Sequence, residues 1–198
     1  LRAACTSRAT PAPLPLALAM ALIDAEARAK HRPAWQQLDI AAPPASCRTV
    51  VTFGGDDPDA LCQEIAAANP PAIKLKLRGG PADLTVIRAI TQTFPVPLAV
   101  DVNGAWAVED APGKLAALEA IRPDLLWVEQ PCPPERIDRR LPTHLPIFAD
   151  EGVDHPGADL SVYDGVVLKP APAGIARCIE VPQRARSAGL QVTMGCHL

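Results

Sequence analysis

Three acidic residues end short apolar runs of the sequence and could bind a metal ion together. The runs PLAVD, LLWVE and PIFAD end on Asp101, Glu129 and Asp150. Three carboxylates that converge without a cation repel one another and are costly to desolvate, whereas a hard divalent ion prefers oxygen ligands of this kind. The pattern predicts a Mg²⁺ site formed by these three side chains. The alternative is that each carboxylate caps the helix that follows it.

Lysines stand at comparable positions in two other runs, AIKLKL and DGVVLK. Because side chains alternate across a strand, Lys74 and Lys76 share one face, and Leu75 and Leu77 share the other. A nearby cation and partial burial both disfavour the ammonium form, which suits a lysine for general-base catalysis. With Lys76 on the second strand and Lys169 on the sixth, one lysine could remove a substrate proton and the other return it on the opposite face. Solvated lysines on an exposed edge strand are the alternative for Lys74 and Lys76.

Seven apolar runs bounded by turn residues predict the strands that must position these groups. Helix-like stretches lie between several of them. In the first stretch Asp56 or Asp57 can cap the helix, Pro58 suits its first turn, and Leu61, Ile65 and Ala68 recur at helical spacing. Between 170 and 189 we expect a weaker helix that Pro182 kinks or splits. The predicted strands lie at 49–53, 72–77, 97–101, 125–129, 146–150, 164–169 and 190–195.

Strands that alternate with helices of this length imply parallel pairing through right-handed crossovers, hence a doubly wound sheet or a (β/α) barrel. Charged residues at the ends of five successive runs favour the barrel, because barrel enzymes assemble their sites at the carboxyl ends of the strands. The chain has 198 residues and begins with Leu1, and typical barrels have about 250. We therefore expect a truncated or partial α/β protein, an incomplete TIM-type barrel at 41–198 preceded by a helical remnant of a capping domain at 1–40.

Composition points to small-molecule chemistry. The net charge is −3, without a long block of like charges, so neither nucleic acid nor anionic membrane is an expected partner. No run reaches the roughly 18 to 20 apolar residues of a membrane span, and a cytoplasmic location is expected. Homo-oligomer formation stays open. The six cysteines form no C-x-x-C pair, and we expect reduced, mostly buried thiols.

The order K-x-K, D-x-N, V-E-Q-P, A-D-E and a strand-six lysine resembles the muconate lactonizing enzyme subgroup of the enolase superfamily, within the mandelate racemase/muconate lactonizing enzyme family. The resemblance runs from about Leu16 to the end of the chain and is closest to dipeptide epimerases. It implies that Asp101, Glu129 and Asp150 bind Mg²⁺. It also implies an acid/base pair, Lys76 and Lys169, and supporting or substrate residues at Lys74, Asn103, Glu151 and Cys196.

The resemblance implies an isomerase, a Mg²⁺-dependent racemase or epimerase that removes the proton α to a carboxyl or amide carbonyl of a dipeptide such as L-Ala-D/L-Glu, or of an N-acyl amino acid. Two segments depart from the epimerase pattern. Gly152 stands where serine is usual, and LKPAPAGI replaces a segment that usually carries a second lysine and a Gly-Gly pair. LKP also resembles o-succinylbenzoate synthases.

Several other functions stay open. On the same scaffold they are o-succinylbenzoate synthase, N-succinyl amino acid racemase and cycloisomerase. A class I aldolase would use Lys169 to form a Schiff base with its substrate. The last alternative is an inactive truncated remnant, because an open barrel would expose a strand edge and admit water to the site.

Overall fold

The computed structural model describes residues 13–151, 153 and 159–195. Contacts within the chain define two compact units. One comprises Leu1–Arg48, Leu168–Gln183 and Met194–Leu198, and the other comprises Thr49–Val167 and Arg184–Thr193. The division into a helical remnant at 1–40 and a barrel at 41–198 stays a prediction.

Within the described residues, seven strands form one sheet and are hydrogen-bonded to one another in sequence order. Each neighbouring pair from β1 and β2 to β5 and β6 is parallel. The seven predicted strands are therefore confirmed, although β4 is shorter than its predicted run. The strands are β1 (Val51–Gly54), β2 (Ile73–Lys76), β3 (Leu98–Asp101), β4 (Val128–Glu129), β5 (Ile147–Ala149), β6 (Gly165–Leu168) and β7 (Gln191–Met194).

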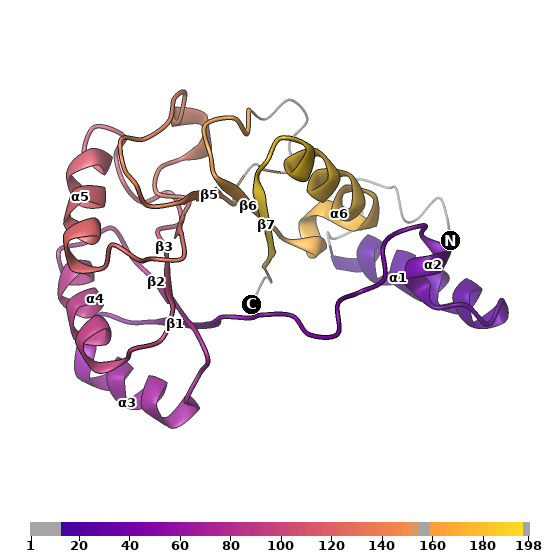
Figure 1. Cartoon of the computed structure of the whole chain (residues 1–198), viewed down its shortest axis with the longest axis horizontal. Helices are drawn as coiled ribbons and strands as arrows, with labels where there is room; N and C mark the ends of the chain where they lie inside the picture. Colours follow the sequence, from indigo (N-terminus) through magenta and orange to yellow (C-terminus); the bar gives the residue numbers. More distant parts are fainter. Residues whose placement is uncertain (1–12, 152, 154–158, 196–198) are drawn as a thin grey trace. The chain divides into compact units, whose positions relative to one another are not determined.

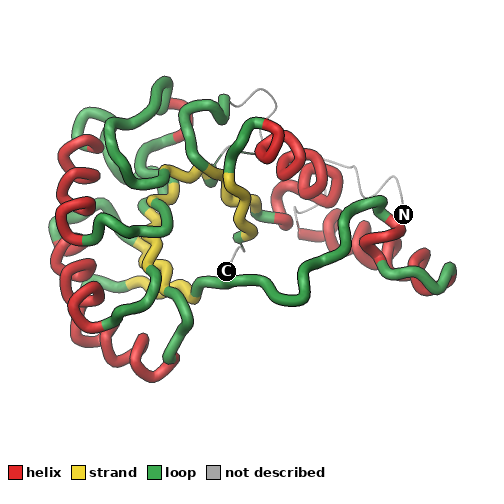
Figure 2. The backbone as a smooth tube through the Cα atoms, in the orientation of Figure 1, coloured by secondary structure: helices red, strands yellow, loops and turns green. Residues whose placement is uncertain are grey.

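Three helices cover one side of the first strands. The helices α3 (Pro58–Ala68), α4 (Ala82–Thr93) and α5 (Ala111–Ile121) follow β1, β2 and β3 and pack against one another in that order. Figure 1 shows these helices side by side along the strands, and Figure 2 shows the strands following an arc with the helices on its outer side. Parallel strands in sequence order with helices outside form an incomplete (β/α) TIM-type barrel, as predicted.

Helix α3 begins as the sequence predicts. The Asp57 side chain accepts hydrogen bonds from two backbone N–H groups of the first turn, at 3.0 and 3.3 Å, and Pro58 is the first helical residue. Leu61 and Ile65 are buried on the inner face. Ala68, the third residue of the predicted apolar face, is exposed because it lies in the last turn, at the end of the helix.

Two connections differ from the predicted pattern. Between β4 and β5 the described helix is a short 3-10 turn, η2 (Pro134–Arg136). Helix α6 (Pro170–Ser187) follows β6 and is interrupted at Gly174, where φ is 73°. Pro182 lies inside the helix and is not the point of interruption. Glycine adopts a positive φ without the steric cost that a Cβ atom imposes, so the break falls there.

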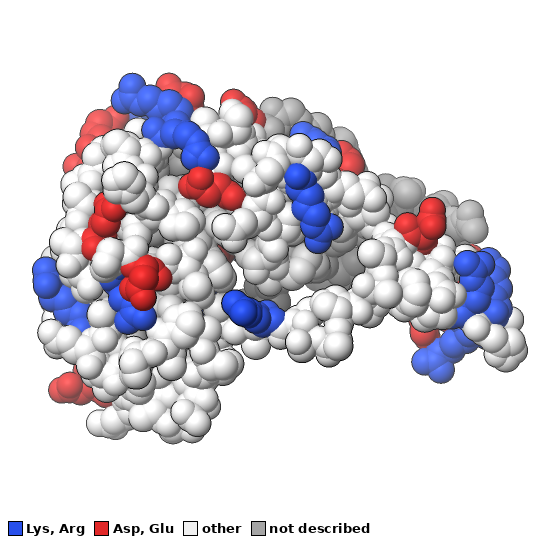
Figure 3. All heavy atoms as spheres, in the orientation of Figure 1, with Lys and Arg blue, Asp and Glu red and all other residues white. Residues whose placement is uncertain are grey.

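The segment before the sheet forms two helices, α1 (Pro13–Ala29) and α2 (Ala34–Gln37). Pro33 precedes α2, and Arg28 pairs with Asp24 at 2.8 Å across one turn of α1. No helix of the described part of the chain is both long and apolar enough to cross a membrane. On the face shown in Figure 3, basic and acidic side chains are interspersed.

The cysteines confirm one prediction and correct another. The four described cysteines are free thiols, as expected. Cys132 is buried, but Cys47 is exposed, and Cys62 and Cys178 are only half-buried. The prediction of mostly buried thiols is therefore wrong for the described residues. Cys47 lies in the connection before β1, and the other two lie on helices, where part of each side chain meets solvent.

Candidate active site

The three carboxylates lie at the carboxyl ends of three neighbouring strands. Asp101 is the last residue of β3, Glu129 is the last residue of β4, and Asp150 directly follows β5. Asp101 and Glu129 are direct partners in the parallel register. Their exposed fractions are 2%, 0% and 4% in chain order. Carboxylates are almost never this deeply buried unless they are paired or coordinate a metal. A positively charged group is therefore expected close to these three side chains.

Lys74 supplies positive charge to two of these carboxylates. Its Nζ lies 2.9 Å from Oδ2 of Asp101 and 2.6 Å from Oε1 of Glu129, and its side chain is 12% exposed. Burial lowers the pKa of Lys74, but the charges of Glu129 and Asp101 and their hydrogen bonds outweigh burial and raise it above its ordinary value. Lys74 therefore stays cationic and serves as a counter-ion.

One ammonium group cannot neutralise two buried carboxylates. Burial and, to a smaller extent, the neighbouring charge of Asp101 raise the pKa of Glu129 to about 7 against the opposing effects of Lys74 and of a hydrogen bond from Trp127. The cluster of Lys74, Asp101 and Glu129 thus carries an excess of negative charge whenever both acids are ionised. A further cation would relieve that excess.

Asn103 orients the Asp101 carboxylate. Its backbone N–H and its side-chain Nδ2 both donate to Oδ1 of Asp101, at 3.1 and 2.7 Å. The second oxygen, Oδ2, faces Lys74. Asn103 has a φ of 51°, a left-handed conformation that asparagine tolerates better than most residues. Both Asp101 oxygens are therefore held by partners on different elements.

Trp127 holds Glu129 from the other side. Its indole Nε1 donates to Oε2 of Glu129 at 3.1 Å, and its ring stacks on Phe148 with centroids 5.2 Å apart and planes 14° apart. A Cβ atom at Gly165 would lie 2.5 Å from the Phe148 ring, so only glycine leaves room for this stack. Sequence reasoning missed this role, although Trp127 directly precedes β4 and lies two residues from Glu129, a spacing that puts side chains on one face of an extended segment.

The remaining predicted residues lie on several elements. Lys76 ends β2, is exposed, and is in register with Asp101, and the buried Leu75 and Leu77 confirm the predicted alternation. Lys169 directly follows β6 and is half-buried, and Glu151 is half-buried after Asp150. Cys196 lies outside the described residues. The structure thus brings together Lys74, Asp101, Asn103 and Glu129.

The donor chemistry of this edge fits Mg²⁺. Three carboxylates supply the hard oxygen ligands that this ion prefers, and two of them already converge on one cationic group, the Lys74 ammonium. Among residues 13–151, 153 and 159–195, no group of three or more His, Cys, Asp or Glu side chains is arranged so that it could hold a metal ion. The residue types and strand positions fit the ion, whereas the side chains of Asp101 and Glu129 contact Lys74.

The loop after β2 is fixed to the loop after β3. The Asp83 carboxylate accepts hydrogen bonds from the backbone N–H groups of Arg78 and Gly79 at 3.1 and 2.8 Å. The Lys114 ammonium donates to the carbonyl of Gly79 at 3.0 Å and lies 5.5 Å from the centre of the Trp106 ring. Lys76 therefore stands at the start of a loop with well-defined anchors.

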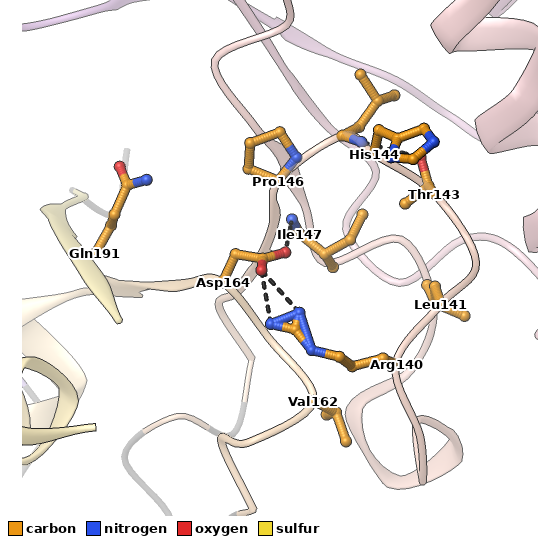
Figure 4. Close-up of a pocket in the computed structure, with 10 residues that line it drawn as sticks. Arg140, Leu141, Thr143, His144, Pro146, Ile147, Val162, Asp164 and Gln191 are labelled. Atoms are coloured by element: carbon orange, nitrogen blue, oxygen red, sulfur yellow. Dashed lines mark hydrogen bonds and ion pairs between the residues drawn. The ribbon is translucent and has the colours of Figure 1, made fainter. Parts of the chain in front are cut away.

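A separate cavity of about 220 Å³ lies at the opposite ends of the strands. Ile147 begins β5, Asp164 precedes β6, and Gln191 begins β7, and all three line the cavity (Figure 4). Arg140 donates two hydrogen bonds to Oδ1 of Asp164 at 2.7 and 2.8 Å, and Oδ2 of Asp164 accepts from the Ile147 N–H at 3.0 Å. None of the predicted site residues lines this cavity, and its charged groups pair with each other.

Parallel strands with outer helices, and acidic and basic side chains at the strands' carboxyl ends, define the class of (β/α)-barrel enzymes. The sequence model of the family described as "Enolase C-terminal domain-like" matches residues 59–198. The chain belongs to this family.

The chain is similar to two curated enzymes. It is 36% identical over 107 residues to an o-succinylbenzoate synthase of Mycolicibacterium smegmatis, and this match covers 50% of the chain and 33% of that enzyme. It is 31% identical over 165 residues to a hydrophobic dipeptide epimerase of Roseobacter litoralis, and this match covers 74% of the chain and 47% of that enzyme. The chain thus spans less than half the length of either relative.

The fold is similar to that of a solved structure described as an enolase family member from Agrobacterium tumefaciens with homology to dipeptide epimerases. The TM-score is 0.79 at 24% sequence identity, and the match covers 100% of this chain and 62% of the other. At this identity the likeness shows the fold alone.

Proposed function

We propose that the chain carries the catalytic region of a Mg²⁺-dependent racemase or epimerase that removes the proton α to a carboxyl or amide carbonyl of a small substrate, a dipeptide or an N-acyl amino acid. The observation that carries this proposal is the buried cluster that Lys74 of β2 forms with Asp101 and Glu129, the last residues of β3 and β4. Burying such charges costs desolvation free energy. A catalytic site that binds charged intermediates would explain why the chain buries them.

Asp101, Glu129 and Asp150 are the residues that would hold the metal ion. A bound Mg²⁺ supplies positive charge that offsets the negative charge developing on the substrate carbonyl oxygen as the proton leaves. The protein's own groups prepare the site. Asn103 and Trp127 each donate a hydrogen bond to a carboxylate oxygen, which keeps Asp101 and Glu129 oriented. Oriented, partly desolvated charges cost little reorganisation during the reaction.

Lys76 and Lys169 are the proposed acid/base pair. Lys76 is exposed at the end of β2, in register with Asp101, so its amine is open to a substrate. Gly54, its neighbour on β1, lacks a side chain, and a Cβ atom there would lie 3.2 Å from the Cβ of Lys76. One lysine takes the α proton and the other returns a proton to the opposite face. A positioned base contributes about 10²- to 10⁴-fold in rate.

The epimerase of Roseobacter litoralis supports a dipeptide substrate, because its similarity extends over 74% of the chain. The second candidate is o-succinylbenzoate formation. It is favoured by the higher identity to the Mycolicibacterium smegmatis synthase, 36%, over a shorter region. Both reactions begin with removal of a proton next to a carbonyl-type group, and they differ in the step after proton removal.

Proton exchange in deuterated water tests the proposal. The chain is incubated with Mg²⁺ and, in separate assays, with L-Ala-L-Glu, with hydrophobic dipeptides and with the precursor of o-succinylbenzoate. Deuterium at the α-carbon of the dipeptides and formation of o-succinylbenzoate are followed by NMR and mass spectrometry. The expected result is exchange that requires Mg²⁺ and is lost in at least one stereochemical direction in both Lys76→Ala and Lys169→Ala. Lys30→Ala, an exposed lysine of another segment, is the control. Formation of o-succinylbenzoate without dipeptide exchange would favour the second candidate, and no exchange on either substrate class would contradict the proposal.

A further inference from the structure

Gln130 follows Glu129 and is fully buried, with an exposed fraction of 0%. Its backbone N–H donates to the Phe148 carbonyl on β5 at 2.9 Å, and its carbonyl accepts from the Gly104 N–H, in the loop after β3, at 2.7 Å. Its φ is 37°, a conformation that costs a non-glycine residue energy unless its surroundings fix it. The backbone of Gln130 therefore joins the carboxyl ends of β3, β4 and β5.

The side chain of Gln130 makes a second set of bonds at the same place. Its Oε1 accepts from the backbone N–H of Asp150 at 2.8 Å, and its Nε2 donates to the Cys132 carbonyl at 2.7 Å. The Tyr163 side chain also contacts this amide by a hydrogen bond. Asp150 is the third of the three carboxylates and directly follows β5. The Gln130 amide therefore fixes the backbone from which the Asp150 carboxylate projects.

We propose that Gln130 is a positioning residue that sets the spacing of the three carboxylates, and so their affinity for a divalent ion. Gln130 itself need not touch the ion or the substrate. The inference rests on the proposed function, because it supposes that Asp101, Glu129 and Asp150 bind one ion. Groups that orient metal ligands contribute about 10- to 100-fold to metal affinity, whereas a buried hydrogen bond elsewhere affects stability alone.

The chain offers a matched control at the other end of β5. Asp164 accepts a hydrogen bond from the backbone N–H of Ile147, the first residue of β5, at 3.0 Å. In the same way, Gln130 accepts a hydrogen bond from the backbone N–H of Asp150, the residue directly after β5. Gln130→Met and Asp164→Ala each remove one acceptor of a backbone N–H of this strand region. Asp164 lies in the cavity away from the carboxylates (Figure 4), so both variants lose stability but only one alters the proposed metal site.

The test measures Mn²⁺ affinity by calorimetry and thermal stability without metal for the wild-type chain and both variants. The expected result is that Gln130→Met binds Mn²⁺ about 10- to 100-fold more weakly, while Asp164→Ala keeps the wild-type affinity although its melting temperature falls too. If Gln130→Met does not fold, Gln130→Asn is used, since its shorter amide cannot bridge Asp150 and Cys132, and the same weakening is expected.

Two outcomes overturn the inference and are distinguishable. If the wild-type chain binds Mn²⁺ and the Gln130 variant binds it equally well, Gln130 is a structural residue only and the proposed function stands. If the wild-type chain does not bind Mn²⁺, the proposed metal site fails and this inference fails with it.

Discussion

The ammonium group of Lys74 lies 2.6 Å from Oε1 of Glu129, although the two residues come from β2 and β4, which are not neighbours in the sheet. The strand between them, β3, contributes Asp101, whose Oδ2 is 2.9 Å from the same nitrogen. One lysine of β2 thus connects the carboxyl ends of β3 and β4. It provides the counter-charge that permits two acidic side chains to be buried side by side.

Replacing Lys74 with methionine would leave Asp101 and Glu129 buried without a counter-ion. We expect Lys74→Met to lower the free energy of unfolding by about 3 to 5 kcal/mol, the usual cost of breaking a buried ion pair from one side. Lys76→Met on the same strand is the control, because Lys76 is exposed, and its effect should stay within about 0.5 kcal/mol. Urea denaturation of the metal-free chain measures both, and equal losses would contradict the counter-ion role of Lys74.

Gly165 should not tolerate a side chain. A Cβ atom there would lie 2.5 Å from the Phe148 ring, so Gly165→Ala must displace Phe148 and its stack on Trp127. We expect a loss of about 1 to 3 kcal/mol, as for other overpacked cores, together with a change in tryptophan fluorescence.

Gly113 is the matched control for this substitution. It lies in α5 with no atom within 4 Å of its Cβ position, and alanine should stabilise the helix by about 0.5 to 1 kcal/mol. Unfolding curves compare the two variants. A Gly165→Ala protein as stable as wild type would contradict the packing described for Phe148.

Cys132 should be much less reactive than Cys47 in the folded chain. Burial and, to a smaller extent, the charge of Glu109 raise the pKa of the Cys132 thiol to about 11 against the opposing effect of Lys114. Cys47 is exposed. Because the thiolate is the reactive form, alkylation of Cys132 near neutral pH should be at least about 100-fold slower. Mass spectrometry of the alkylated peptides separates the two thiols, and similar rates in the native chain would disprove this protection.

Much of the fold could be predicted from the sequence because it depends on local signals. A buried strand leaves a continuous apolar run, and a charge at its end is unusual enough to mark the site, so the seven strands and the positions of Asp101, Glu129 and Asp150 at their ends follow from residue order. The cap of α3 follows from Asp57 and Pro58 for the same reason. These features need no knowledge of distant parts of the chain.

Features that depend on contacts between strands could not be predicted in this way. Trp127 and Gln130 act through Phe148, Asp150 and Cys132, and only the register of the sheet reveals those neighbours. The break in α6 fell at Gly174 rather than Pro182, because tertiary context decides which of two helix-breaking residues is used. The exposure of Cys47 could not be predicted either, because Cys47 lies in an irregular connection whose sequence has no periodic pattern of apolar residues.

Binding of Mn²⁺ by the wild-type chain and by three single variants tests the central claim most directly. The account predicts one ion per chain by calorimetry, with Asp101→Asn, Glu129→Gln and Asp150→Asn each weakening binding by at least about 10-fold. The exposed Asp159, changed to asparagine, should leave the affinity unaltered. Wild-type affinity in the Asp150→Asn protein, or no binding by the wild-type chain, would contradict a metal site shared by the ends of β3, β4 and β5.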